Sequence, residues 1–491
     1  MQTFALRAAT VVAALGVCAC SGWTQPKLIN LNVVALDKSG QPVSDLTAAD
    51  FQVLDDGKPQ SIALFRLNNN SRPADIALAP HEYSNRAKDT PQGATILIFD
   101  LLNGTFTDRN YIAGTIVKAL GQVEKPANVF LYFITNKGEF YPIHPLPNGD
   151  PKTARLDENW TTQSKAMIDA AIQNVYGLRP MDDRDIGVRA VTAYTLLHDL
   201  GAAASAFPGR KAVVWITDGV PLNVNYGGLC RDIPVLSVVA RCTGQFVDFT
   251  PVVRNVGGEL DRDGVTIYPV EAYGITAVTR EVLQDLANIT GGKVFASGGT
   301  VQAVADAVQA MRMNYSIAYE PASWDGRFHK LRVSCKRKGV QVLAEQGYTA
   351  VAPVEDTAKL IQTAAFNAED IAAIGLRATV SASPKPGAIR VHVRIDPSSI
   401  CVTDQNGRFT GQLALIFLAL TDKGPATLSR PNALSLNLTQ AQYETALRDG
   451  VTLSDDLMPP AAVNRIRLVV VDRSTNRVGS LTIPEGGSGK L

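Results

Sequence analysis

Two apolar runs near the middle of this chain each end on an aspartate. The first is Ala94–Asp100, and the second is Lys211–Asp218, which Gly219 follows. A continuous apolar run of this length is typical of a strand that is buried on both faces of a parallel sheet. Ligands of open α/β sheets bind outside the carboxyl ends of the strands. We therefore expect Asp100 and Asp218 to lie on one edge of such a sheet, and we call that edge the crest.

The sequence around these two runs alternates strands with helices. Apolar residues at helical spacing predict helices at about 108–123, 166–175, 187–206, 280–289 and 300–312, and further strands are expected at 129–134, 139–143, 264–270 and 293–295. The strands at 129–134 and 139–143 form one hairpin. This order predicts an α/β fold: a doubly wound, mostly parallel sheet with helices on both faces and an antiparallel strand at one edge.

β-Rich sequence lies on both sides of this α/β domain, to which we assign residues 90–313. The flanks 28–66 and 314–350 are each too short to bury a good core alone, so we expect them to pair as one small β-domain that contains the α/β domain as an insertion. The strands within 375–484 predict a C-terminal immunoglobulin-like β-sandwich. We interpret the polar stretch 68–92 as a linker and 221–262 as a long loop.

The first 21 residues have the features of an export signal. Arg7 precedes the apolar run Ala8–Ala19, which has the length of a signal-peptide h-region and is shorter than the roughly 20 residues that cross a bilayer. We therefore predict a periplasmic or extracellular protein without a transmembrane segment. Cys20 follows Ala19 as in a bacterial lipoprotein cleavage site. A lipid anchor on Cys20 and plain cleavage near Ser21 both stay open.

Four cysteines remain beyond this signal. Cys230 and Cys242 flank a short excursion of the chain, and in an oxidising compartment they are the natural disulfide pair. Cys335 and Cys401 lie far apart in the sequence, and the sequence leaves their pairing open.

Charge and motif content limit the classes of function. The formal net charge is only +1, and no basic block provides the concentrated positive face that nucleic-acid binding needs. His81-Glu82 begins like a zinc-protease motif, but Asn85 stands where the second histidine is required. A nucleophile elbow is absent from the sequence as well. These observations predict a protein that is not an enzyme.

The chain resembles the von Willebrand factor type A superfamily and, more closely, the exported VWFA-related family known from Acidobacteria. The motifs that carry the resemblance are Val33–Val43, Leu46–Val53, Asp56–Pro59, Ile98–Asn103, Gly209–Lys211, Trp215–Gly219, Leu286–Gly292, Tyr315–Pro321 and Gly347-Tyr348. Together they cover roughly residues 28–350. The resemblance implies a type A domain, which binds protein ligands through a metal-ion-dependent adhesion site. That site uses an Asp-x-Ser-x-Ser loop, a later threonine and a later aspartate.

This chain matches only part of that site. Asp100 stands at the first aspartate and Asp218 at the last, whereas Leu102 and Gly104 replace the two serines. Neither replacement offers a side-chain oxygen to Mg²⁺, which takes about six oxygen ligands in a near-octahedral array. The resemblance therefore implies a degraded metal site.

Neighbouring oxygen-bearing side chains offer an alternative ligand set for Mg²⁺ or another divalent cation. Asn103 and Thr105, in a reshaped loop, and Thr162, at the later threonine, could join the two aspartates. The alternative is that Asp100 and Asp218 cap helices or accept hydrogen bonds from backbone amides. With either arrangement we predict an exported adhesion module that recognises a protein or glycan at the crest. The competing hypothesis is a structural scaffold of the cell envelope that has no ligand site.

Overall fold

The computed structural model divides into two compact units. The larger unit contains Ile29–Asp75 and Asp89–Ala352, and the C-terminal unit contains Ile76–Lys88 and Pro353–Leu491. The structure describes residues 28–69, 78–86, 93–103, 109–121, 129–135, 137–144, 146, 165–166, 168–170, 186–205, 207, 209–220, 223–225, 241–243, 246–271, 277–296, 298–350, 357–367, 370–405, 407–421, 424–460, 463 and 465–484. The predicted signal segment, with Cys20, lies outside these residues.

A five-stranded sheet forms the centre of the larger unit. Its order is β13-β9-β6-β7-β8, where the strands are β6 (Ala94–Asp100), β7 (Val129–Ile134), β8 (Phe140–His144), β9 (Lys211–Thr217) and β13 (Val265–Glu271). The first four strands in this order are parallel, and β8 pairs antiparallel with β7. The mostly parallel sheet with an antiparallel edge strand is therefore confirmed. Every residue of β6, β9 and β13 is buried, which explains their continuous apolar runs.

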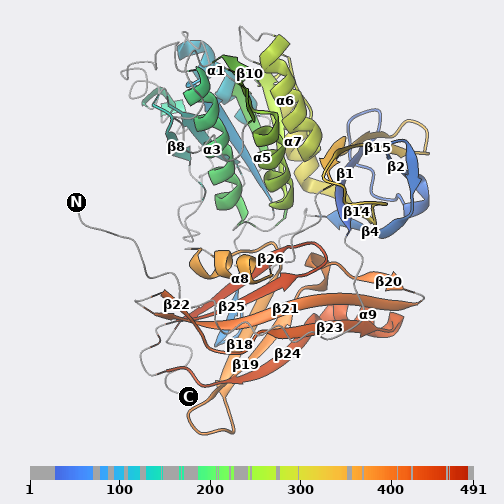
Figure 1. The fold of residues 1–491 in the computed structure, drawn as a ribbon, viewed down its shortest axis with the longest axis vertical. Coiled ribbons are helices and arrows are strands. Elements are labelled where there is room, and N and C mark those ends of the chain that lie inside the picture. Colours follow the sequence, from blue (N-terminus) through green and yellow to red (C-terminus); the bar gives the residue numbers. More distant parts are fainter. Residues whose placement is uncertain are drawn as a thin grey trace. The chain divides into compact units, whose positions relative to one another are not determined.

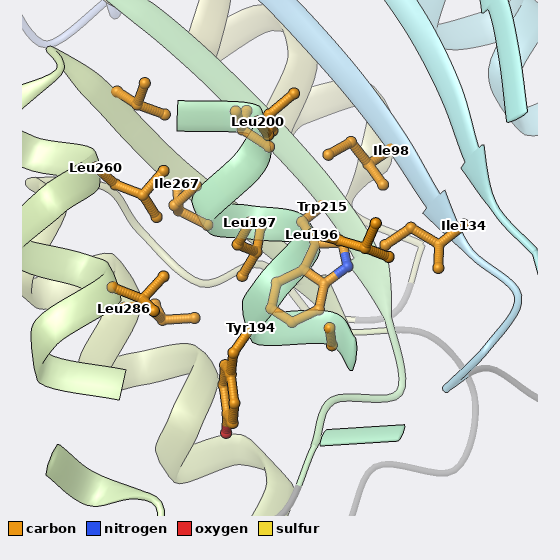
Figure 2. Packing of buried hydrophobic residues seen from close by; sticks show 14 of the residues in the cluster. Ile98, Ile134, Tyr194, Leu196, Leu197, Leu200, Trp215, Leu260, Ile267 and Leu286 are labelled. Atoms are coloured by element: carbon orange, nitrogen blue, oxygen red, sulfur yellow. The ribbon is translucent and has the colours of Figure 1, made fainter. Parts of the chain in front are cut away.

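Helices cover both faces of this sheet (Figure 1). One apolar cluster joins the sheet to α3 (Ile186–Ser205), α5 (Thr250–Arg262) and α6 (Ala277–Thr290), and the other joins it to α1 (Arg109–Leu120) and α7 (Thr300–Arg312). Figure 2 shows the first cluster, in which the fully buried Trp215 of β9 lies against the side chains of α3.

The prediction of a long loop at 221–262 is wrong over much of its length. It contains a small sheet of β10 (Asn223–Asn225), β12 (Phe246–Asp248) and β11 (Arg241–Thr243), and then helix α5. Helix α5 was not predicted because the sequence there contains Pro251 and Gly257-Gly258, and both residue types weaken a helix interior. Pro251 is tolerated in the first turn. A Cβ on Gly257 would stand 3.1 Å from the Ile289 side chain, so glycine allows α5 to pack close to α6.

The two flanks of the α/β domain pair as two four-stranded sheets. Their orders are β16-β1-β14-β4 and β17-β15-β2-β3. The strands are β1 (Ile29–Leu36), β2 (Phe51–Asp55), β3 (Lys58–Gln60), β4 (Ile62–Asn69), β14 (Met313–Tyr319), β15 (Phe328–Cys335), β16 (Gln341–Leu343) and β17 (Gly347–Thr349). Each sheet takes strands from both flanks, and one apolar cluster includes residues of both sheets. Neither flank contains a complete sheet by itself.

A buried ion pair joins this β-domain to the amino end of the five-stranded sheet. Arg210, directly before β9, lies 3.7 Å from Glu345 of the β-domain, and both side chains are almost fully buried. The guanidinium of Arg210 also donates to the side chain of Thr266 and to the carbonyl of Thr290. The backbone amide of Asn32 donates to both oxygens of Glu345. One charge pair thus connects β1, β9, β13 and the end of α6.

The C-terminal unit consists of two antiparallel sheets around one apolar core. One sheet has the order β24-β19-β18-β5, and the other has β20-β21-β25-β26, with β22 and β23 also paired to β21. The elements are β5 (Glu82–Ser84), α8 (Thr357–Phe366), β18 (Leu376–Ala382), β19 (Ile389–Ile395), β20 (Thr403–Gln405), β21 (Arg408–Thr421), β22 (Gly424–Thr427), β23 (Asn432–Leu438), α9 (Gln440–Asp449), β24 (Val451–Leu457), β25 (Arg465–Asp472) and β26 (Val478–Pro484).

Strand β5 corrects the interpretation of 68–92 as a linker. It pairs with β18, nearly three hundred residues later in the chain. The Asn85 amide then donates to the carbonyls of Ile371 and Ile374, and Arg86 pairs with Asp396 at 2.6 Å. Because the partners are so distant in sequence, local polarity could not reveal this strand.

Candidate functional site

The crest is the carboxyl end of the five-stranded sheet, and polar side chains gather there. Its described members are Asp100, Asn103, Thr135, Thr217, Asp218 and Glu271. They stand at the ends of β6, β7, β9 and β13 or in the residues that follow, because the parallel register brings these four ends to one edge.

Asp100 organises the loop after β6. Its side chain is fully buried, and it accepts hydrogen bonds from the backbone amide of Asn103 at 2.9 Å, the Asn103 side-chain amide at 3.1 Å and the Thr217 hydroxyl at 2.8 Å. Burial raises the pKa of Asp100, and the three hydrogen bonds only partly oppose the rise. These donors are neutral, and among the residues that the structure describes no cation pairs with this carboxylate.

Leu102 shows why the loop differs from an adhesion-site loop. It stands where the sequence resemblance expects the first serine, is only 4% exposed and belongs to the apolar cluster that contains Trp215. Its carbonyl accepts a hydrogen bond from Arg189 of α3 at 3.4 Å. The side chain at this position is therefore used as core packing.

The other crest residues also bond to their own loops. Thr217 accepts from the amide of Gly219 at 3.0 Å, and Thr135 accepts from the amides of Lys137 and Glu139, both at 3.3 Å. Glu271 pairs with Arg280 of α6 at 2.6 Å. The crest is thus a framework of polar groups that fixes the chain where it leaves each strand.

The structure brings only part of the predicted metal set together. Asp100 and Asn103 are bonded to each other, and Asp218 directly follows the threonine that bonds Asp100. The hydrogen bond from the Asn103 backbone amide to Asp100 is the kind that the alternative interpretation expected. Thr105 and Thr162 lie outside the described residues, so the full ligand set stays a prediction.

The structure tests the cysteine predictions only in part. Cys230 lies outside the described residues, while Cys242 lies on β11, so their disulfide stays a prediction. Cys335 is a free thiol, and the described residues contain no Cys335–Cys401 disulfide.

Sequence reasoning missed a second polar cluster, which lies in the β-domain. Asp55, at the end of β2, accepts from the hydroxyls of Tyr319 and Tyr348, both at 2.9 Å. Its other oxygen lies 2.9 Å from Nδ1 of His329, and Nε2 of His329 lies 3.2 Å from Asp325. The Asp55-Asp56-Gly57 turn was a visible signal, but the histidine comes from a distant strand.

His329 is held among carboxylates on both sides of its ring. Burial alone would lower the pKa of His329, but hydrogen bonds to Asp55 and Asp325 outweigh it and raise the pKa. Nδ1 of His329 and one oxygen each of Asp55 and Asp56 lie within 4.8 Å of one another. This nitrogen and two carboxylates could hold a divalent cation, although hydrogen bonds to the histidine and the tyrosines already satisfy Asp55.

Among the described helices, none is both long and apolar enough to cross a membrane.

Comparisons with known proteins add little. No family model matches the chain, and no curated protein matches it. Human COPII-coat protein Sec24c is similar over 80% of this chain, with 11% identity and a TM-score of 0.27, and the chain spans 44% of its length. An aerotolerance-related membrane protein from Bacteroides fragilis, with multiple mutations to serines, is similar over 45% of this chain and 98% of its own length, with 12% identity and a TM-score of 0.25. At these TM-scores the likeness assigns neither a family nor a function.

Proposed function

We propose that this protein is an exported, non-enzymatic binding module that recognises a protein or glycan of the cell envelope at the crest. In this proposal the five-stranded sheet and its helices are a von Willebrand factor type A domain inserted into the two-flank β-domain. The C-terminal unit is an immunoglobulin-like sandwich. The metal-dependent adhesion site of the type A domain is degraded.

The main support is the unequal use of the two ends of the five-stranded sheet. The amino end is joined to the β-domain through the buried Arg210–Glu345 pair. The carboxyl end carries the connections that leave β6, β7, β9 and β13, the edge at which α/β sheets bind ligands. Lys137 and Glu139, in the β7–β8 turn at this edge, and Arg280 of α6 are exposed.

The arrangement of the crest favours binding over catalysis. The carboxylates of Asp100 and Glu271 and the hydroxyl of Thr135 are engaged by neighbouring groups of the protein. His144, the described histidine of this sheet, lies at the opposite end, where its ring contacts the Val129 carbonyl at 2.6 Å. The Thr217 hydroxyl does lie beside the Asp100 carboxylate, but both side chains are fully buried, so the pair is not exposed to a substrate.

Site-specific photo-crosslinking tests this proposal. A photo-reactive phenylalanine analogue would replace Lys137 in the crest or, as a matched control, Lys118 near the carboxyl end of α1. Both lysines are exposed. Lys137 follows the carboxyl end of β7, whereas Lys118 lies in the last turn of α1, the helix that returns the chain from the end of β6 to the start of β7. After export, illuminated cells should yield a discrete adduct at position 137 and none at position 118. The partner, once purified, should bind the wild-type protein and compete with the adduct.

Two results would count against binding at the crest. Equal adducts at both positions would indicate non-specific contact. No adduct at position 137, in protein that fractionates and melts like the wild type, would favour the scaffold hypothesis.

A further inference from the structure

The outer face of one sheet in the C-terminal unit carries an unusual set of polar residues. Strand β19 alternates buried apolar residues with outward-facing Arg390, His392 and Arg394. The neighbouring strand β18 alternates in the same way and presents Arg377 and Thr379. In β24 the exposed Thr452 and Ser454 alternate with half-buried Val451 and Leu453. Because alternation with period two places these side chains on one face, they form a continuous polar surface.

This surface is hollowed to a volume of about 210 Å³. Its polar lining comes from two rows that run across the strands. In the first row Arg377 pairs with Arg394, which pairs with Thr452. In the second row the order is Glu82, Thr379, His392 and Ser454. The hollow is smaller than the roughly 300–1,000 Å³ sites of drug-sized ligands, so it suits a single small unit such as one sugar residue.

The electrostatics of the first row are unfavourable without a ligand. Arg377 and Arg394 stand directly opposite each other on adjacent strands, and like charges in this position destabilise a sheet. Glu82 lies 3.6 Å from Arg377 and offsets one of the two charges. Among the described residues, Arg394 forms no ion pair. Two arginines and one glutamate therefore leave one positive charge at the hollow.

Arg390, which lies on β19 like Arg394, does have a carboxylate partner. Arg390 is bonded through two nitrogens to Asp456, at 2.8 and 3.0 Å. Among the residues that the structure describes, the sheet thus supplies a carboxylate to Arg390 and none to Arg394, which lies four residues away on the same face. The stem of Arg394 lies against Gly450, where any Cβ would collide with it. Glycine therefore makes room for this arginine at the edge of the hollow.

We propose that the hollow binds an anionic saccharide. Its oxyanion would lie between Arg377 and Arg394, because a guanidinium matches the geometry of carboxylate or sulfate oxygens. The sugar hydroxyls would bond to the second row, where Nδ1 of His392 already lies 2.6 Å from the Ser454 hydroxyl. Hydroxyls and an imidazole beside an oxyanion pocket suit a polyhydroxylated acid better than an apolar peptide. This site is independent of the crest, which belongs to the other unit.

Calorimetric titration of the full chain tests the proposal. Trigalacturonate supplies carboxylates, a sulfated disaccharide supplies the other oxyanion, and methyl-esterified trigalacturonate is the neutral control. Sodium sulfate tests a free anion. We expect one or both acidic saccharides to bind. The ester and free sulfate should bind at least about tenfold more weakly, because the ester lacks the charged oxyanion and free sulfate lacks the sugar hydroxyls.

Two variants locate the site. Arg394→Gln should weaken binding by about tenfold or more. Arg390→Gln removes the same charge from the same strand and should leave binding unchanged. Arg394→Gln should keep the melting temperature near that of the wild type. Arg390→Gln should melt lower, because it loses the Asp456 pair, and the titration is run well below its melting temperature. The proposal fails if neither acidic saccharide binds, if ester or free sulfate binds as tightly, or if the two variants weaken binding equally.

Discussion

The two ends of the five-stranded sheet bury charged groups in different ways. At the amino end, the buried carboxylate of Glu345 has a full cation, Arg210, 3.7 Å away. At the carboxyl end, the partners of the buried Asp100 carboxylate among the described residues are neutral: the Asn103 backbone amide, the Asn103 side-chain amide and the Thr217 hydroxyl. Burial raises the pKa of both carboxyl groups, and at Glu345 the charge of Arg210 opposes the rise.

This difference indicates two roles: the Arg210–Glu345 pair, which we call the joint, fixes the β-domain to the sheet, whereas the crest supports loops. A buried ion pair is strongly destabilising to break, since one charge is left without a partner. Neutral donors around a carboxylate cost less to disturb, and they belong to the loop that they organise. The amino end therefore fixes the β-domain to the sheet, while the carboxyl end can vary its loops.

The largest effect should come from breaking the joint. Arg210→Met keeps much of the side-chain volume but leaves Glu345 buried without its cation. We expect the free energy of unfolding to fall by about 3–5 kcal/mol, as measured by denaturant titration. The double variant Arg210→Met/Glu345→Gln should recover part of this loss, because the glutamine still accepts from the Asn32 amide. Equal losses in the single and double variants would show that the pair is not the joint.

A smaller loss is expected at the crest. Asp100→Ala leaves the Asn103 and Thr217 donors without an acceptor in a buried place, which costs about 1–3 kcal/mol. Loss of local order should accompany it, so amide hydrogen exchange should rise at Leu101–Asn103 more than at β1. If Asp100→Ala destabilised the protein as much as Arg210→Met does, the contrast between the two ends would not hold.

The pH dependence gives a more subtle distinction. Because burial raises the pKa of Asp100, the folded protein holds this proton more tightly than the unfolded chain. Stability from this group is complete below the ordinary aspartate pKa of 3.8 and is lost as pH rises through the folded value. Asp100→Asn cannot titrate. The variant should therefore gain in melting temperature relative to the wild type as pH rises through that window, and a constant difference would contradict the assignment.

The sequence predicted the elements that local patterns encode. The buried runs of β6 and β9 are visible as apolar stretches that end on aspartates, and helix α7 follows from its apolar spacing. Strand β5 could not be predicted, because it is only three residues long, two of them are polar, and its partner β18 lies far along the chain. Helix α5 was missed because Gly257 serves the packing against α6 at the expense of helix propensity.

The candidate sites show the same limit. Asp100 and Asp218 could be placed on one edge from the strand order alone. The inward side chain of Leu102 and the hydrogen bonds from Asn103 depend on the loop geometry, which the sequence does not specify. The pairing of Arg377 with Arg394 needs the register of two strands, and a shift of one residue would place them on opposite faces.

The smallest expected effect is the response to Mg²⁺. A cation at the crest would have to displace the three donors of Asp100, while Leu102 supplies core packing where the adhesion site has a serine. A metal that binds only the folded state must raise the melting temperature.

We therefore expect the melting temperature in Mg²⁺ to equal that in chelator, both for the wild-type protein and for Asp100→Asn. The Asp55–Asp56–His329 group could also take a cation, so His329→Ala serves as the control. A Mg²⁺-dependent rise that survives His329→Ala but disappears in Asp100→Asn would show that the crest keeps a working metal site.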